Sequence, residues 1–298
     1  MAVPTVPTTT TLATEGLKKA IHSVPSAALI ARATDYYMEE IKGDLQLKAA
    51  TVQKKLRSLF KTGFLVIDEG KHRYALPSDF LGDLTLTLMD GEHTGTATAG
   101  AAGSVTLAAD EDISEDDAVG RYVLITGGTG EASCSQITAY NTTTKVATVT
   151  PDFATAPASG STYLIVDRYR PIQPTNSNEF DGYSSPTTKG EPNRYVYQGD
   201  QDTGEIVLYP TPDQTYGLQL RYYLDLSLLD LTDNRMSTLY RKWRNLWVQG
   251  VKAKQMESDN HRDKAAELQR YYQYIDAVIF DETSGQDLGE VNFQVGIE

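Results

Sequence analysis

The most regular pattern of apolar and polar positions lies between residues 232 and 282. Its first half repeats an apolar or small residue every three or four positions, at Met236, Leu239, Tyr240, Trp243, Leu246, Trp247, Gly250 and Val251. Its second half does the same, at Leu268, Tyr271, Tyr272, Ile275, Val278 and Ile279. This spacing puts the apolar side chains on one face of a helix. The polar residues 258–260 interrupt it, so the pattern predicts two helices joined by a short turn.

We expect this helical hairpin to be the scaffold of the fold. No other long segment is so regular, and both tryptophans of the chain fall on its first helix. Aromatic residues in such a stripe belong to a hydrophobic core far more often than to an active site. We therefore predict that Trp243, Trp247, Tyr271 and Ile275 form a buried core scaffold.

Three further helices are predicted before the first strand. The first is short and is broken by Pro25. The second covers residues 26–41 and is ended by Gly43, and the third covers residues 48–61 and is stopped by Gly63.

The apolar period changes to two after Gly63, which indicates β-strands. Residues 64–67 and 73–76 flank a turn-forming segment and predict a hairpin. Further strands are predicted at residues 84–89, 194–198, 205–209 and 217–224, with residues 210–213 joining the last two as a second hairpin. Between them, residues 169–192 read as a long irregular loop.

The composition changes abruptly after Gly91. Residues 92–167 are rich in Thr, Ala, Gly and Ser and carry ten acids but only two bases, Arg121 and Lys145. Short β-type runs recur there, at residues 104–107, 122–126, 135–140, 146–149 and 163–166. This pattern predicts a small all-β sandwich or barrel inserted into a parent fold. The predicted class is α+β: a helical bundle with a small antiparallel sheet (residues 1–91 and 168–298) carrying an inserted β domain (residues 92–167).

The search for catalytic and metal-binding motifs favours a protein that is not an enzyme. The four histidines are scattered, and none has a second ligand-type residue four positions on. The turn at residues 127–130 lacks the Gly-Lys-Ser/Thr ending of a phosphate loop. The acids at residues 110–112 and 115–117 lack the spacing of an EF-hand and are expected to form a solvated loop. Cys134 is the single cysteine. We predict no metal and no cofactor.

The net charge of −13 argues against a surface that binds nucleic acid over the whole protein. A local basic face is predicted at Lys54, Lys55, Arg57 and Lys61. Followed by the first hairpin, these bases resemble a winged-helix DNA reader, although a face that meets an acidic partner subunit fits better.

Two further expectations concern the ends and the cellular setting. The Pro- and Thr-rich residues 1–11 read as an extended arm rather than a signal peptide, and no apolar run reaches the roughly 18 residues of a membrane helix. An intracellular protein without a membrane partner is therefore expected. Near the other end, four large apolar residues alternate with smaller or polar ones, at Val291, Phe293, Val295 and Ile297. This period of two predicts a strand that docks on a partner chain or folds back on its own subunit.

Several stretches resemble the head-to-tail adaptor (connector) proteins of tailed bacteriophages. They are Tyr-Ala-Leu-Pro-Ser-Asp-Phe at residues 74–80, Gly-Glu-Ile-Val-Leu-Tyr-Pro-Thr-Pro at 204–212 and Leu-Gln-Leu-Arg-Tyr-Tyr at 218–223, ahead of the C-terminal helices. The segment 94–166 resembles small β modules of phage structural proteins. The resemblance implies a virion protein of the neck, assembled in the host cytoplasm. It would form a ring of about twelve subunits, bound to the portal protein above and a tail or nozzle protein below. Genomic DNA would pass through the ring without sequence-specific binding.

Three other readings compete with the connector. The β insert could make the chain a tail-associated protein that binds a receptor or carbohydrate, although the insert has few aromatic residues: Tyr122, Tyr140, Phe153 and Tyr163. An enzyme would need a catalytic constellation that the sequence does not present. A winged-helix regulator would need the basic segment to lie on a helix that reads DNA.

Overall fold

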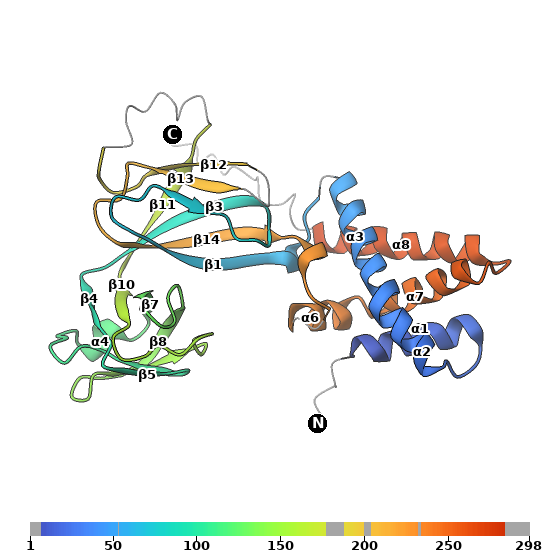
Figure 1. Cartoon of the computed structure of the whole chain (residues 1–298), viewed down its shortest axis with the longest axis horizontal. Helices are drawn as coiled ribbons and strands as arrows, with labels where there is room; N and C mark the ends of the chain where they lie inside the picture. The colour runs from blue at the N-terminus through green and yellow to red at the C-terminus, as the bar shows by residue number, and fades with distance from the viewer. Residues whose placement is uncertain (1–6, 53, 177–187, 200–203, 232–233, 284–298) are drawn as a thin grey trace, which may run out of the picture. The chain divides into compact units, whose positions relative to one another are not determined.

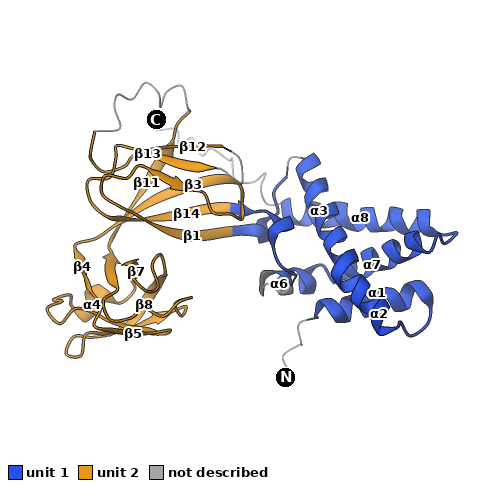
Figure 2. Cartoon of the chain, in the orientation of Figure 1, with its two compact units in different colours: residues 1–60, 223–298 blue, residues 61–222 orange. Residues whose placement is uncertain are grey.

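The computed structural model describes residues 7–52, 54–176, 188–199, 204–231 and 234–283 (Figure 1). The contacts divide the chain into two compact units (Figure 2). One joins residues 1–60 to residues 223–298 and is helical, and the other is residues 61–222 and is built from strands. The chain is therefore of mixed α+β class. None of its described helices combines the length and the apolarity that crossing a membrane requires.

The helices in the N-terminal part of the helical unit are interrupted at fewer positions than predicted. α1 (Thr9–Ile21) starts at an N-cap hydrogen bond to Thr8 and ends at His22, whose φ of 54° lies in the left-handed region. α2 (Ala27–Arg32), the π-helical turn η1 (Ala33–Tyr37) and α3 (Met38–Thr51) then follow without a break. The prediction that Gly43 ends a helix was wrong. Burial of Ile41 and Leu45 on either side of it continues the helix through the glycine.

The predicted helix at residues 48–61 is helical only over residues 48–51, which form the end of α3. α3 ends at Thr51, a short 3-10 turn η2 (Arg57–Leu59) follows, and β1 (Phe60–Ile67) begins directly after it. The local apolar spacing had suggested a helix, but Leu56 and Leu59 are buried from a non-helical backbone. Tertiary packing overrides the local periodicity in this segment.

The C-terminal part of the helical unit contains the predicted pair of long helices. η3 (Leu226–Leu228) leads to α6 (Asn234–Lys242), α7 (Arg244–Ser258) and α8 (Lys264–Thr283). α6 and α7 are separated at Trp243, whose backbone leaves the helical region (φ −115°, ψ 37°). The turn after Ser258 lies where the polar interruption predicted it. α7 packs against α1, α3 and α8, so it is the central helix of this unit.

The first sheet of the other unit has seven strands in the order β1-β14-β3-β11-β12-β13-β2. Besides β1, its strands are β2 (Arg73–Ala75), β3 (Phe80–Asp90), β11 (Arg168–Pro174), β12 (Arg194–Gln198), β13 (Glu205–Tyr209) and β14 (Tyr216–Leu224). With seven strands, the sheet is larger than predicted. Because β11 and β12 run parallel, it is mixed rather than antiparallel. β11 also gives regular structure to the start of the segment predicted as an irregular loop.

Both predicted hairpins of this sheet were wrong. β1 and β2 lie at opposite edges, and β13 and β14 are not neighbours either. The segment between β1 and β2 contains only five residues, so the two edges must approach each other and the sheet curls. Its turn is held from elsewhere, because Gly70 N donates to Pro212 O at 2.9 Å. A turn signal shows where the chain reverses but not which strand becomes the partner.

The segment predicted as an insert, for which we keep the name insert, forms a second seven-stranded sheet in the order β4-β10-β7-β8-β9-β6-β5. Its strands are β4 (His93–Thr96), β5 (Ala99–Ala101), β6 (Ser104–Thr106), β7 (Tyr122–Gly127), β8 (Cys134–Asn141), β9 (Val146–Thr150) and β10 (Thr162–Val166), and a short helix α4 (Glu115–Ala118) follows β6. β4 and β5 are the two edges, yet only two residues separate them. The sheet therefore curls on itself around a core that includes Val105, Ile125 and Ile137.

The two sheets share a small apolar cluster where the chain passes between them. Val66 and Met89 of the first sheet pack with Leu124, Leu164 and Val166 of the insert. The chain enters and leaves the insert side by side, because Asp167 N donates to Asp90 O at 3.0 Å.

One expectation for the insert needs correction. The acidic residues 110–112 do not form a fully solvated loop, because Glu111 is only 7% exposed. Its carboxylate accepts hydrogen bonds inside the insert, which offset the cost of burying its charge.

Candidate interaction surfaces

Three of the four predicted bases, Lys54, Lys55 and Arg57, lie in the segment between α3 and β1 and contact their own chain. Lys55 Nζ is 5.8 Å from the centre of the Tyr223 ring, a cation–π contact. Arg57 donates from Nη2 to Asp281 O, the carbonyl of a residue near the end of α8, at 3.1 Å. The backbone N–H of Lys54 donates to Ala49 O at 3.0 Å. These contacts hold the segment to the helical unit, and a role in binding a partner stays a prediction.

Lys61, the fourth predicted base, belongs to the other unit and forms an ion pair there. Its Nζ lies 2.7 Å from Asp79 Oδ2, and Tyr222 donates to Asp79 Oδ1 at 2.7 Å. Burial alone would raise the pKa of Asp79, but the hydrogen bonds from Lys61 and Tyr222 outweigh it and lower this pKa. Asp79 therefore stays ionised and compensates the charge of Lys61.

The four residues predicted as core scaffold are all buried in the helical unit. Trp243 is 5% exposed, and Trp247, Tyr271 and Ile275 are fully buried. Trp247 packs its ring edge-on against Tyr240, with centroids 5.1 Å apart.

Tyr271 also ties two helices together through a polar contact. Its hydroxyl donates from α8 to Asp44 Oδ2 on α3 at 3.0 Å. Burial, reinforced by the charge of Asp44, raises the pKa of Tyr271. The phenol therefore stays protonated and keeps donating this hydrogen bond.

The predicted docking strand cannot be placed. Val291, Phe293, Val295 and Ile297 lie outside the described residues. Their proposed role rests on the alternating sequence pattern alone.

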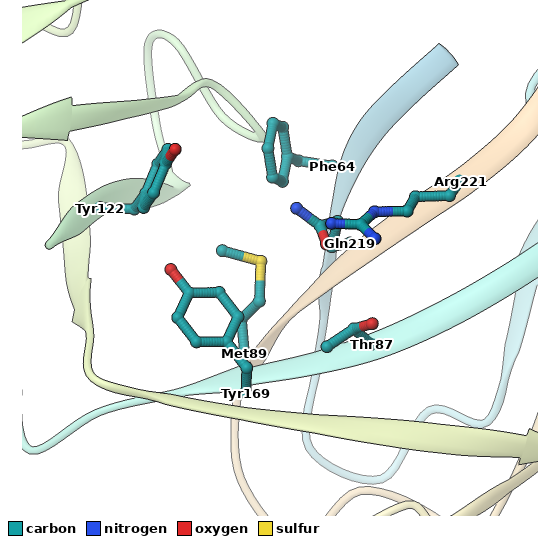
Figure 3. Close-up of a pocket in the computed structure, with 7 residues that line it drawn as sticks. All are labelled: Phe64, Thr87, Met89, Tyr122, Tyr169, Gln219 and Arg221. Atoms are coloured by element: carbon teal, nitrogen blue, oxygen red, sulfur yellow. The ribbon is translucent and has the colours of Figure 1, made fainter. Parts of the chain in front are cut away.

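A hollow of about 310 Å³ lies beside the contact of the two sheets (Figure 3). It is lined from β1, β3, β7, β11 and β14, by Phe64, Thr87, Met89, Tyr122, Tyr169, Gln219 and Arg221. In Figure 3 the rings of Phe64, Tyr122 and Tyr169 surround one part of the hollow, and the ends of Gln219 and Arg221 face it from another. The side chain of Met89 lies between these rings and the two polar ends.

The lining suits a ligand, or a side chain of a partner protein, that has an apolar body and a polar or acidic end. Three aromatic rings offer apolar contact, and the guanidinium of Arg221 offers paired donors to a carboxylate. Burial, with smaller contributions from Cys134 and Tyr122, raises the pKa of Tyr169 to about 12, so its hydroxyl stays a neutral donor. Sequence reasoning missed this hollow because its residues come from five strands that the sequence does not show to be adjacent.

Comparison with known proteins gives one family. The family described as SU10 adaptor protein matches residues 129–291, which is more than half of the 298 residues. The matched span begins inside the insert and continues through the first sheet and the C-terminal helices. No curated protein matches the sequence.

Proposed function

The chain belongs to the SU10 adaptor protein family of bacteriophage structural proteins, and from this membership we propose that it builds a ring at the junction of head and tail. The ring, of about twelve subunits, docks on the portal protein and extends the DNA channel towards the tail. A tail or nozzle protein binds its other side. The observation that carries this proposal is the family match, which spans both the β-rich unit and the helical unit.

A closed ring needs two different, mutually complementary surfaces on each subunit. The hollow at Phe64 and Arg221 provides a candidate for one of them, since it can receive an apolar side chain next to a carboxylate. The predicted C-terminal strand provides a candidate for the other. Its alternation of large apolar residues is typical of segments that add a strand to another chain.

The charge of the chain supports a passive DNA channel. DNA affinity arises mainly from neutralising phosphates with basic side chains, and this chain has a net charge of −13. The bases that suggested a winged helix do not share one helix, since Arg57 begins the 3-10 turn η2 and Lys61 lies in β1, and both are engaged with their own chain. These contacts weaken the case for a DNA-reading regulator.

Carbohydrate binding, the second candidate, loses most of its support from the insert. Sugar rings stack on exposed aromatic side chains, but Tyr140, Phe153 and Tyr163 are at most 4% exposed and belong to the insert core. Tyr122 is the remaining aromatic residue of the four and faces the hollow.

The decisive experiment is a mass measurement of the full chain, alone and mixed with the purified portal protein of the same phage. Light scattering and native mass spectrometry should find a complex of the portal with about twelve copies of the chain. A chain that stays monomeric and unbound in this mixture would contradict the proposal. Gel-shift measurements on duplex DNA at physiological salt should find no submicromolar binding, whereas tight binding would support the regulator.

A further inference from the structure

Three potential metal ligands meet in the insert although they are far apart in the sequence. His93 starts β4, whereas Glu111 and Asp112 lie in the loop between β6 and α4. His93 Nδ1 is 2.7 Å from Glu111 Oε1 and 3.7 Å from Asp112 Oδ1. All three ligand atoms lie within 4.8 Å of one another, and no other such group occurs in the described part of the chain.

Glu111 is held in place from several sides. Its side chain is 4% exposed. Tyr163 donates to Oε2 at 2.7 Å, and Ile113 N donates to Oε1 at 3.3 Å. Lys145 donates to the backbone carbonyl of Glu111 at 2.6 Å and so fixes the loop. Metal ligands typically have such supporting hydrogen bonds, which orient the coordinating oxygen before the ion arrives.

Further carboxylates lie around the three candidate ligands. Glu92 and Asp110 line the same hollow of about 400 Å³, which brings four carboxylates to it in all. A cation would offset the charge of these carboxylates.

We propose that His93, Glu111 and Asp112 bind a divalent transition-metal cation, for which zinc is the representative. One imidazole with carboxylates favours zinc over calcium, which prefers oxygen ligands alone. Ligand atoms about 2.0–2.1 Å from a tetrahedral zinc are roughly 3.3 Å apart. The two separations from His93 Nδ1, 2.7 and 3.7 Å, lie on either side of this value, and the third pair of ligand atoms is within 4.8 Å, so side-chain rotations would have to adjust the spacing when the ion binds. Water completes the coordination.

The cation would fasten the acidic loop to edge strand β4. Because β4 and β5 are the two edges of the curled sheet, a ligand shared by the loop and β4 would stabilise the closure of the insert. The role is structural and adds nothing catalytic. The competing explanation is that His93 and Glu111 form only a hydrogen-bonded pair.

The test is a titration of the full-length, chelator-treated protein with zinc chloride, followed by calorimetry and thermal melting. Asp112→Asn is the principal variant, because the Asp112 side chain is 91% exposed and its loss should leave the fold intact. His93→Asn removes the nitrogen ligand. Asp116→Asn is the matched control, since it removes an exposed acid of the same insert outside the cluster.

The site would be supported by binding of one zinc per chain and by a raised melting temperature. The zinc affinity should be at least about tenfold lower in Asp112→Asn and His93→Asn but unchanged in Asp116→Asn. No saturable zinc binding, or equal affinity in all variants, would overturn it. The proposal would also be overturned if calcium bound more tightly than zinc and its affinity were unchanged in His93→Asn, because the site would then be a carboxylate cluster.

Discussion

Gly16 of α1 lies so close to Val251 of α7 that a Cβ atom built on the glycine would be 2.7 Å from the Cβ of the valine. The same Cβ would be 2.8 Å from the backbone oxygen of Val248, which cannot move aside as a flexible side chain can. Gly16→Ala should therefore force the helices apart and lower the free energy of unfolding by about 1–3 kcal/mol, despite the better helix propensity of alanine. Urea unfolding followed by circular dichroism measures this loss.

Gly43 provides the matched control for Gly16. It also lies inside a helix, α3, but apart from its chain neighbours and the adjacent backbone of α3, no atom lies within 4 Å of the Cβ that it would gain. Gly43→Ala should stabilise the chain by about 0.5–1 kcal/mol through helix propensity alone. Equal effects of the two substitutions would show that the close contact of α1 and α7 is not as described.

Trp247→Ala tests the predicted scaffold. Trp247 is fully buried and stacks edge-on with Tyr240, so its loss should cost about 3–5 kcal/mol of unfolding free energy. Trp243→Ala should have an effect of the same order. Phe280→Ala, at a side chain that is 73% exposed on α8, should change the stability of the isolated chain by less than about 0.5 kcal/mol. An unchanged melting temperature in Trp247→Ala would refute the scaffold role.

Glu267 on α8 should make stability depend on pH. Lys252 Nζ and Gln249 Nε2 each lie 2.8 Å from Glu267 Oε2. Burial alone would raise the pKa of Glu267, but these two hydrogen bonds and the charges of Lys252 and Arg270 lower it below 4.5. A lowered pKa gives stability that is complete above the unfolded-state value and is lost as the pH falls through the folded-state value.

Glu267→Gln should consequently cost about 1–3 kcal/mol at pH 7, and the cost should shrink as the pH falls below about 4. Thermal melts of both proteins between pH 7 and pH 3 measure this difference. Asp276→Asn on the same helix is the control, since the Asp276 side chain is 58% exposed. A cost for Glu267→Gln that does not vary with pH would contradict the ion pair.

Deleting residues 92–166 tests whether the insert is a separate domain. The flanking residues Asp90 and Asp167 are hydrogen-bonded, so a short Gly/Ser link can join them. We expect the remaining chain to fold cooperatively, with some loss of stability because Val66 and Met89 lose their apolar partners in the insert. The fragment 92–167 should fold alone around its own core. Aggregation of both the deletion protein and the fragment would show that the insert is not a separate domain.

Truncation after Ser284 tests the predicted docking strand. The shortened chain should keep its helix and strand content but lose ring formation or portal binding. Within the full chain, Phe293→Ser with Val295→Ser should impair assembly, whereas Asn292→Ser with Gln294→Ser, on the other face of the predicted strand, should not. Native mass spectrometry with the portal protein distinguishes these outcomes. Normal assembly of the truncated chain would exclude a docking role.

Local pattern predicted most of the elements themselves. The long helices of residues 234–283 follow their apolar period because each buries one face, and most strands of the insert lie at the predicted β-type runs. The hairpins failed because strand pairing in the first sheet is non-local: β1 pairs with β14 and β2 with β13. A period of two identifies a strand but carries no information about its neighbour.

The candidate sites were harder to predict for the same reason. His93 and Glu111 are 18 residues apart and meet only because the insert curls. The hollow at Phe64 and Arg221 needs β1 beside β14, which no local signal shows. Conversely, the bases after α3 looked like one face because the sequence suggested a helix there, and the structure replaces that helix with a turn and a strand.

The π-helical turn at residues 33–37 fixes the rotational phase of the helix that contains it. Met38 N donates to Ala33 O, five positions back, so the turn holds one residue more than an α-helical turn. Before it, α2 contacts α1, and beyond it, α3 contacts α7 and α8. Losing one residue here would rotate everything from Met38 onward by about 100° and carry Ile41 and Leu45 out of the core. Insertions and deletions that a loop would tolerate are therefore disallowed at this point unless they occur in whole helical turns.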